Sequence, residues 1–272
     1  MKRIGLLGCG SIGSQIAIAI DTGKIPAKLT HIFDEDKKKS ELLASKLKQK
    51  PEIVENVHLL SSNPVDLIVE AASQAAVSDN ALSILQNRKD LLIMSGGALL
   101  DESVYEIITD ACKELKKNVY LPSGAISGLD AIKSVKTELN SVILTTTKHP
   151  NSLKGAPFFD NYKINLDDIT EPSTIFEGTA SEAVRLFPKN INVSALLSLV
   201  GLGSHETIVK IIADPTTTKN THMITSSGTF GKITTIVENI PDENTPKTSR
   251  LAILSAIETL RSICTDEIRI GT

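Results

Sequence analysis

A glycine-rich turn close to the start of the chain restricts the possible fold more than any other feature of the sequence. The apolar run 2–7 leads directly into Gly8-x-Gly10-x-x-Gly13, and apolar residues at helical spacing follow it. A strand, such a turn and a helix in this order are typical of dinucleotide-binding folds. The first glycine permits a tight turn, the second lets a pyrophosphate approach the backbone, and the third lets helix and strand pack closely. The predicted phosphate-binding residues are Gly8, Gly10, Ser11, Ile12 and Gly13.

An acidic residue lies where such a fold holds the ribose of its ligand. The apolar run 29–33 ends at Asp34, at the expected distance of about 20 positions from the last glycine. A carboxylate there binds the ribose 2′-hydroxyl and repels a 2′-phosphate, so Asp34 favours NAD over NADP. Lys37-Lys38-Lys39 lies close by, and a lysine there would instead accept a 2′-phosphate. The sequence therefore predicts NAD or NADP as cofactor and leaves the choice open.

The composition is that of an ordinary soluble globular protein. The 272 residues exceed a typical single domain, and 41% of them are hydrophobic. A formal net charge of −3 gives no electrostatic reason to expect a nucleic-acid partner. The sequence shows neither a secretory signal nor an apolar run long enough to cross a bilayer, so we expect a cytoplasmic protein without a membrane partner.

The cysteines indicate reduced thiols. Cys9, Cys112 and Cys264 are widely spaced and form no CxxC pair, which predicts no metal site. Cys9 lies inside the glycine turn, where a small residue is needed, so we expect it to pack rather than to act as a nucleophile.

The pattern of predicted secondary structure changes near residue 122. Strand-like and helix-like runs alternate before this point, which predicts an α/β fold with a Rossmann-type, doubly wound parallel sheet. Runs with β character follow it, and 227–231 (Ser-Gly-Thr-Phe-Gly) is a turn signal for an antiparallel hairpin. We therefore expect a second α+β domain of mixed sheet with helices on one face. The predicted domains are 1–122 for the dinucleotide, 123–245 for the substrate, and 246–272 as a C-terminal helix returning to the first domain.

The predicted elements follow from these periodicities. Strands are expected at 3–7, 29–33, 65–70, 91–95, 118–121, 141–147, 173–177, 207–213, 222–226 and 232–238. Helices are expected after the glycine turn and at 36–49, 74–85, 101–116 and 248–263.

Histidine is the natural proton carrier for a nicotinamide enzyme, because its ordinary pKa is about 6.5. Among the five histidines, His222 is the best placed, since it follows a polar turn at the start of a strand in the second domain. A lone histidine is, however, more often structural than catalytic. The others are His31, His58, His149 and His205.

Two polar segments of the second domain each have a functional and a structural interpretation. Asn192 precedes the apolar helix 194–200, where it would serve as an N-cap or direct its amide at the nicotinamide carboxamide. Lys148 lies in 145–149 (Thr-Thr-Thr-Lys-His) and suits an anionic substrate, although a solvated strand end explains it nearly as well.

A series of short segments matches one known family in order. They are 8–13, 69–73 (Val-Glu-Ala-Ala-Ser), 95–99 (Ser-Gly-Gly-Ala-Leu), 122–128 (Pro-Ser-Gly-Ala-Ile-Ser-Gly), 152–157 (Ser-Leu-Lys-Gly-Ala-Pro), 187–193 (Phe-Pro-Lys-Asn-Ile-Asn-Val), 213–215 (Ala-Asp-Pro), 220–222 (Asn-Thr-His), 228–231 (Gly-Thr-Phe-Gly) and 244–249 (Asn-Thr-Pro-Lys-Thr-Ser). Through them the chain resembles the L-aspartate dehydrogenase family over nearly its whole length.

The resemblance implies oxidation of L-aspartate through iminoaspartate to oxaloacetate and ammonia, with NAD or NADP accepting the hydride. It also implies that the imine can be passed on toward quinolinate in NAD biosynthesis, and that the protein is a homodimer joined through its second domain. The family's active-site histidine falls on His222. Its cofactor-contacting alanine and asparagine fall on Ala125 and Asn192, with Asn190 as an alternative to the latter. Ala72 and Ser73, in the matching segment 69–73, are predicted to bind the cofactor as well. His149 departs from the family pattern, in which we expect a proline-like residue after the lysine.

These expectations lead to a mechanism in which His222 takes or relays a proton and helps a water attack the iminium carbon. Lys148, Ser226 and Ser227 are the candidate donors to the substrate carboxylates, and Lys148 is the stronger because its contact is charge-assisted. Two alternatives remain. One is a related two-domain NAD(P) oxidoreductase, such as a homoserine dehydrogenase-like or dihydrodipicolinate reductase-like enzyme. The other is a non-catalytic, NAD-sensing regulator.

Overall fold

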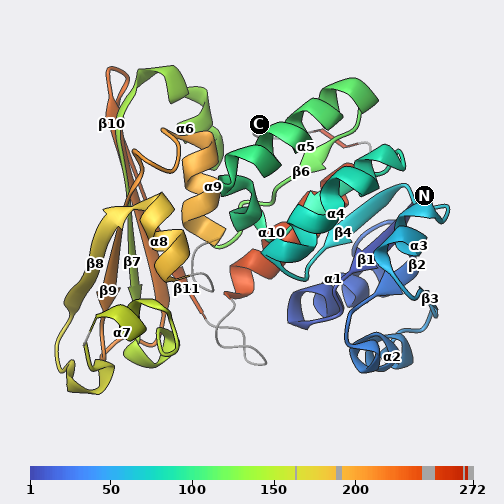
Figure 1. Cartoon of the computed structure of the whole chain (residues 1–272), viewed down its shortest axis with the longest axis horizontal. Coiled ribbons are helices and arrows are strands. Elements are labelled where there is room, and N and C mark those ends of the chain that lie inside the picture. Colours follow the sequence, from blue (N-terminus) through green and yellow to red (C-terminus); the bar gives the residue numbers. More distant parts are fainter. Residues whose placement is uncertain (163, 188–191, 241–248, 266, 269–272) are drawn as a thin grey trace. The chain divides into compact units, whose positions relative to one another are not determined.

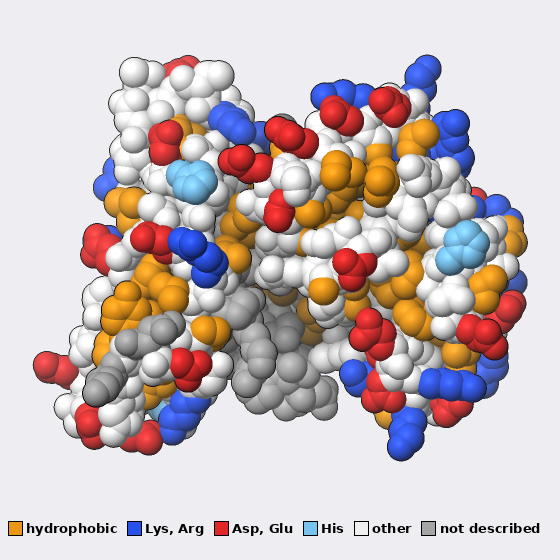
Figure 2. All heavy atoms as spheres, in the orientation of Figure 1, with side chains coloured by type: hydrophobic (Ala, Val, Ile, Leu, Met, Phe, Trp, Pro, Cys, Tyr) orange, Lys and Arg blue, Asp and Glu red, His pale blue; other side chains and the backbone are white. Residues whose placement is uncertain are grey.

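The computed structural model of the chain describes residues 1–162, 164–187, 192–240, 249–265 and 267–268. The chain falls into two compact units, one of Met1–Pro122 with Ile253–Ile270 and one of Ser123–Ala252. None of the described helices combines the length and the apolar character needed to cross a bilayer. Acidic and basic side chains are interspersed over the face seen in Figure 2.

The first unit contains a six-stranded parallel sheet. Its strands are β1 (Lys2–Leu7), β2 (Ala27–Phe33), β3 (Glu52–Ile53), β4 (Leu67–Glu70), β5 (Asp90–Ile93) and β6 (Val119–Tyr120). They lie in the order β3-β2-β1-β4-β5-β6, and all neighbouring strands are parallel. This is the strand order of a doubly wound nucleotide-binding fold, so the predicted Rossmann-type sheet is confirmed. The sequence pattern does not predict β3, which is too short to show a period.

Helices cover both faces of this sheet (Figure 1). They are α1 (Ser11–Asp21), α2 (Lys37–Lys46), α3 (Val57–Ser62), α4 (Gln74–Gln86), α5 (Glu102–Leu115) and α10 (Arg250–Cys264), with a 3₁₀ turn at Gly96–Leu100. Ile4 and Leu6 of β1 pack with α1, α2 and α10 into one buried cluster. Gly5 lies between them and faces Leu60 of α3, because successive strand residues point to opposite faces.

The second unit contains a five-stranded mixed sheet. Its strands are β7 (Leu139–Lys148), β8 (Ser173–Thr179), β9 (Ile208–Ala213), β10 (Asn220–Gly228) and β11 (Gly231–Asn239). They lie in the order β11-β10-β7-β9-β8, with β7 and β9 parallel and the other pairs antiparallel. The hairpin expected at 227–231 is formed by β10 and β11, which Thr229 and Phe230 connect. The predicted mixed sheet is confirmed.

Helices of the second unit lie on one face of its sheet, as Figure 1 shows. They are α6 (Leu129–Ser134), α8 (Ala180–Leu186) and α9 (Asn192–Val200), while α7 (Phe158–Asn161) and 3₁₀ turns at Lys136–Glu138, Pro150–Ser152 and Leu166–Asp168 lie in the connections. Val142 and Leu144 of β7 point into the core formed with these helices. Because strand residues alternate, polar side chains of β7 and β10 on the helix face are covered as well.

Candidate functional site

The glycine turn between β1 and α1 is shaped by two close backbone approaches. Gly8 has a φ of +97°, and a Cβ on it would lie 2.6 Å from the carbonyl carbon and oxygen of Ala71, in the loop after β4. A Cβ on Gly13 would collide with the carbonyl oxygen of Gly8. Only glycine fits at either position, so the turn is tight and α1 begins directly against β1.

The middle glycine of the turn faces open space instead. A Cβ on Gly10 would have no neighbouring atom within 4 Å, although its φ of −71° suits any residue. Gly10 is also the N-cap of α1 and, as a glycine, provides no side-chain cap to the first turn of that helix. An open cradle beside uncapped helix amides fits the pyrophosphate of a dinucleotide, because these amides and the helix dipole favour an anion.

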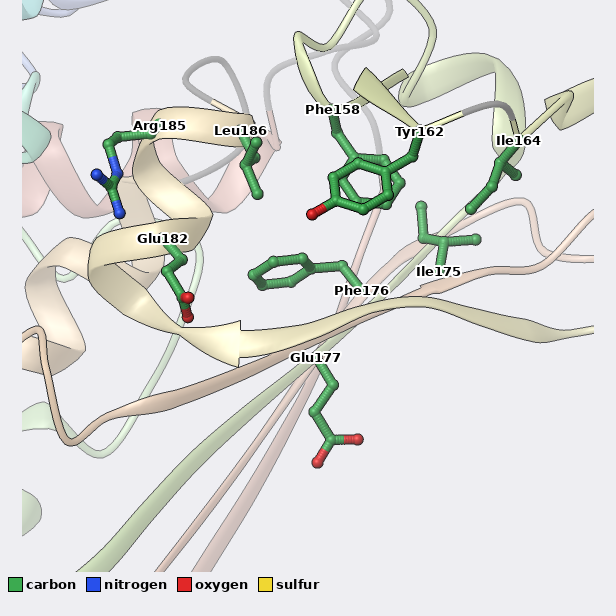
Figure 3. Close-up of a pocket in the computed structure, with 9 residues that line it drawn as sticks. All are labelled: Phe158, Tyr162, Ile164, Ile175, Phe176, Glu177, Glu182, Arg185 and Leu186. Carbon is green, nitrogen blue, oxygen red and sulfur yellow. The ribbon is translucent and has the colours of Figure 1, made fainter. Parts of the chain in front are cut away.

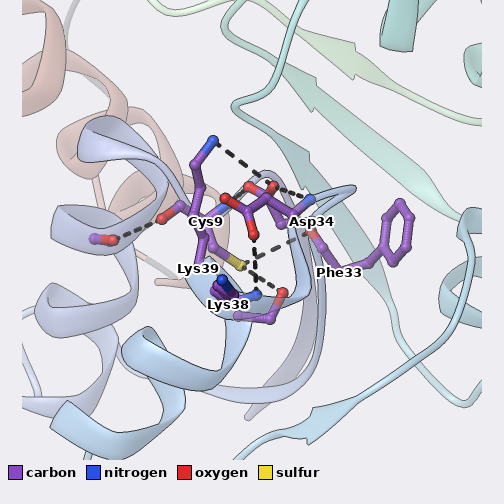
Figure 4. A network of polar contacts seen from close by, with 8 residues as sticks. Cys9, Phe33, Asp34, Lys38 and Lys39 are labelled. Carbon is purple, nitrogen blue, oxygen red and sulfur yellow. Dashed lines mark hydrogen bonds and ion pairs between the residues drawn. The ribbon is translucent and has the colours of Figure 1, made fainter.

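Asp34 connects the end of β2 to the glycine turn (Figure 4). Its carboxylate accepts hydrogen bonds from the backbone N–H of Cys9 at 2.7 Å and of Asp36 at 2.9 Å. The ammonium of Lys39 lies 4.0 Å away. A carboxylate, which favours NAD, and a half-exposed lysine, which favours NADP, thus lie side by side at the end of β2. The structure is therefore compatible with either cofactor.

Cys9 is a packed thiol. Its sulfur lies 3.6 Å from the hydroxyl of Ser40 and 3.8 Å from the carbonyl oxygen of Phe33. Burial raises the pKa of Cys9 to about 11, so the group is a protonated thiol at neutral pH rather than a nucleophilic thiolate.

Sequence reasoning missed a buried carboxylate, Glu70, at the carboxyl end of β4. Only 1% of this residue is exposed, and it accepts four hydrogen bonds. Oε1 accepts from the N–H of Ala72 and from the hydroxyl of Ser95, each at 2.8 Å, and Oε2 accepts from the N–H of Met94 and of Ser95. Glu70 therefore holds the loop after β4 to the loop after β5. The sequence feature that could have revealed this carboxylate is an acidic residue at the end of the apolar run Leu67-Ile-Val-Glu70.

In the second unit, His222 lies on the helix-covered face of the sheet. It is 3% exposed, and its Nδ1 lies 3.0 Å from the hydroxyl oxygen of Thr146, its cross-strand partner on β7. Lys148 is two residues further along β7 on the same face and is 5% exposed. The structure thus brings His222 and Lys148 together, with Thr146 as a neighbour that sequence reasoning did not single out.

Burial changes the protonation of both groups. Burial, followed by the charge of Lys148, lowers the pKa of His222 to about 3, so the imidazole is neutral at physiological pH. Burial lowers the pKa of Lys148 to about 8, which places its titration close to neutral pH. The expectation of a solvated strand end at Lys148 is therefore wrong.

The two predicted serine contacts do not join this group. Ser227 lies on the opposite face of the sheet from His222, because β10 alternates and the two are five positions apart. Ser226 is on the correct face but fully buried, and four strand residues place it about 13 Å from His222. Neither serine lies where it would share a substrate with His222.

A pocket in the second unit is lined mainly by aromatic and aliphatic side chains (Figure 3). It has a volume of about 570 Å³ and lies between α7, β8 and α8. Glu182 accepts hydrogen bonds from Thr179 in the cap of α8, and Glu177 forms an ion pair with Lys210 at 2.9 Å. In Figure 3 the Glu177 side chain points away from the rings. Both carboxylates are thus engaged, so we place the chemistry at His222.

Comparisons with known proteins decide the family. Residues 130–263 match the family model "Aspartate dehydrogenase, C-terminal", and residues 8–122 match "Homoserine dehydrogenase, NAD binding domain". The L-aspartate dehydrogenases of Nitrosopumilus maritimus and Methanocella arvoryzae are 65% and 45% identical, each over 100% of both chains. The chain belongs to the L-aspartate dehydrogenase family. The crystal structure of aspartate dehydrogenase from Thermotoga maritima has a TM-score of 0.77 at 28% identity and covers 99% of both chains.

Membership in the L-aspartate dehydrogenase family confirms the resemblance drawn from the sequence, and the first unit is its pyridine-nucleotide domain.

Ala125 is buried, and its carbonyl accepts a hydrogen bond from Asn239 at 2.9 Å. Asn192 is exposed and is the first residue of α9 instead of the residue before the helix, so its predicted N-cap position is wrong by one. The alternative Asn190 lies outside the described residues.

Proposed function

We propose that this chain oxidises L-aspartate with NAD or NADP, through iminoaspartate, to oxaloacetate and ammonia. The observation that carries the proposal is the 65% identity, over both full lengths, with an L-aspartate dehydrogenase. The glycine turn and the buried His222 supply the two parts that this chemistry needs. These are an anion cradle for a dinucleotide and a titratable group in a water-poor site.

Three groups of residues are proposed to bind the cofactor. The turn residues Gly8, Gly10, Ser11, Ile12 and Gly13 hold the pyrophosphate, and Asp34 holds the ribose. Ala72 and Ser73 are proposed cofactor contacts as well, and they follow Glu70 in the loop that packs on Gly8. Ala125 and Asn192 are proposed contacts to the nicotinamide end. When bound, the nicotinamide accepts a hydride from the substrate Cα.

His222 is proposed as the catalytic residue. A neutral imidazole accepts a proton at one nitrogen while it gives one up at the other, so it passes a proton without holding the charge. Thr146 at Nδ1 fixes which nitrogen is turned toward the substrate. General acid–base help is worth about 10²- to 10⁴-fold, so His222→Ala is expected to lower kcat by about that factor and leave NADH affinity near wild type. A variant that kept full turnover would remove His222 from this role.

The proposed preference for NAD rests on Asp34, whose carboxylate accepts a hydrogen bond from the Cys9 N–H of the turn and lies 4.0 Å from the ammonium of Lys39. We further propose a homodimer, a cytoplasmic location and a role in NAD biosynthesis, as the family resemblance implies. The sheet face opposite α6, α8 and α9 supports the dimer, because it carries Ile143, Met223 and the 62% exposed Ile236. Analytical ultracentrifugation of wild type and Ile236→Lys tests the dimer, and a wild-type monomer would refute it.

Initial rates of NAD and NADP reduction with L-aspartate test the proposed reaction and the cofactor together. A homoserine dehydrogenase-like enzyme is the second candidate, favoured by the family model that matches residues 8–122. L-homoserine is therefore included as substrate. Reduction with homoserine and not with aspartate would replace the proposal. Tight NADH binding without turnover of any amino acid would favour the sensor.

A further inference from the structure

The protonation states of the buried pair pose a chemical problem. Aspartate must lose an ammonium proton before hydride transfer, because the nitrogen lone pair stabilises the positive charge that develops at Cα. An imidazole whose pKa is lowered to about 3 is a poor final acceptor for that proton. A second titratable group on the same face of the sheet would provide a place for this proton.

We propose that Lys148, as a neutral amine, is the final acceptor of the substrate proton, which reaches it through His222 and Thr146. This role rests on the proposed oxidation of aspartate and takes the place of a carboxylate contact for Lys148. The geometry carries it, because the three side chains lie in one row on the helix-covered face of β7 and β10. Thr146 is hydrogen-bonded to His222 on one side. On its other side, Thr146 and Lys148 line the same small cavity under α9.

The proposed transfer is balanced in protons and moves no electrons between residues. The substrate ammonium gives a proton to Nε2 of His222, and Nδ1–H gives one to the hydroxyl oxygen of Thr146. The hydroxyl proton of Thr146 then passes to Nζ of Lys148, directly or through a water. The cavity volume of about 10 Å³ corresponds to about one water molecule. The net result is a neutral substrate amine and a Lys148 ammonium. His222 and Thr146 keep their number of protons, and the imidazole proton has moved from Nδ1 to Nε2.

The surroundings of Lys148 favour an amine that titrates near neutral pH. The faces of β9 and α9 that line the cavity with it carry Val209, Ile211 and Ser194, none of them ionisable. His222 on β10 is the titratable group facing it within the described residues. Asp214 follows β9 and donates its backbone N–H to the Lys148 carbonyl, but its carboxylate is solvated and bonded to Thr216. Burial lowers the pKa of Lys148 to about 8, within reach of physiological pH.

Two substitutions at one position separate a proton acceptor from a carboxylate contact. Lys148→Met removes the amine at nearly constant length, while Lys148→Arg keeps a positive charge that does not titrate. For wild type, kcat with saturating NAD is expected to rise with pH through an apparent pKa of about 8. Both variants are expected to lose that limb, and at pH 9 both should lose about 10²- to 10⁴-fold in kcat. An arginine variant with wild-type turnover and pH profile would overturn the relay.

Binding of succinate gives a readout independent of turnover. Succinate has the two carboxylates of aspartate and no amine, so calorimetry at pH 9 reports only the carboxylate contacts. The relay predicts that Lys148→Met binds it within about threefold of wild type. A loss of tenfold or more that Lys148→Arg restores would show a carboxylate contact and overturn the relay.

A second pair of variants tests the middle of the row. Thr146→Val keeps the shape of the side chain without the hydroxyl and is expected to lower kcat, while Thr146→Ser restores the transfer. Equal kcat for both variants would overturn the role of Thr146. Lys210→Met is the matched control, since Lys210 lies on β9 with its side chain on the opposite face. If wild type itself shows no aspartate-dependent reduction, the proposed function fails; if wild type is active and Lys148→Arg behaves like it, only the relay fails.

Discussion

Replacement of Glu70 by glutamine tests whether the buried carboxylate shapes the cofactor loops. The side chain accepts four hydrogen bonds, two at each oxygen. A glutamine amide retains only one of these oxygens. If the amide oxygen faces Met94 and Ser95, the new NH₂ group opposes the N–H of Ala72. The hydroxyl of Ser95 can reverse and accept instead, so this orientation leaves one buried donor unpaired. The other orientation turns the NH₂ group toward the N–H groups of Met94 and Ser95. It leaves the N–H of Ser95 unpaired, while that of Met94 keeps its hydrogen bond to the backbone carbonyl oxygen of Glu70 at 3.0 Å.

The better orientation sets the expected cost. One unpaired buried N–H costs about 1–3 kcal/mol, and the remaining hydrogen bonds lose their charge assistance. We therefore expect the loops after β4 and β5 to be destabilised by about 2–4 kcal/mol. Burial raises the pKa of Glu70, although the four donors favour its ionised form, so the comparison is made at pH 8.

Hydrogen exchange is the suitable assay, because a chain of two units does not unfold in a single two-state step. The amides of Ala72, Met94 and Ser95 are expected to exchange about 30- to 1,000-fold faster in Glu70→Gln. NADH affinity is expected to fall as well, because Gly8 of the cofactor-binding turn packs directly on Ala71 in the loop after β4. Glu182→Gln is the matched control, an exposed glutamate that caps α8 in the second unit. Wild-type exchange rates together with wild-type NADH affinity would refute the reasoning.

Three further substitutions test the glycine turn and the ribose acid. Gly10→Ala is expected to leave the melting temperature near wild type and to weaken NADH binding by at least about tenfold, or 1.4 kcal/mol, because the added Cβ occupies only the open cradle; unchanged affinity would contradict a pyrophosphate there. Gly13→Ala is expected to lower both stability and affinity, since its Cβ would strike the Gly8 carbonyl oxygen, and calorimetric melting with NADH titration checks both. Asp34→Ser is expected to lower the ratio of kcat/KM for NAD to that for NADP by about tenfold or more. A ratio that did not change would mean that Asp34 does not contact the ribose.

Local chemistry explains why the first unit was predictable. A strand, a glycine turn, a helix and a distal acid lie within 34 residues, and each has a backbone or charge requirement that is visible in the sequence. β3 and α3, which are two and six residues long, have no period that the sequence reveals. The mixed sheet of the second unit was predicted from runs with β character and from the turn signal at 227–231, but its strand order was not.

The candidate site was only partly accessible to such reasoning. His222 was selected from its position at the start of a strand and from the family resemblance, and Lys148 from its charge at a strand end. The structure does bring them together. Ser226 and Ser227 were selected as hydroxyl donors to the substrate carboxylates, and they follow His222 by four and five residues. A strand turns neighbouring residues to opposite faces and advances about 3.3 Å per residue, so closeness in sequence did not bring them to the imidazole.

The order of motifs along the chain determined the nucleotide-binding half and the family, because these depend on short segments whose geometry is local. Only the tertiary structure decided which polar groups are buried together and how they are protonated. Thr146 meets His222 across 76 residues of chain, and Glu70 meets Ser95 across 25. Burial that shifts a pKa arises from strands and helices packed from distant parts of the sequence, and no local pattern encodes it.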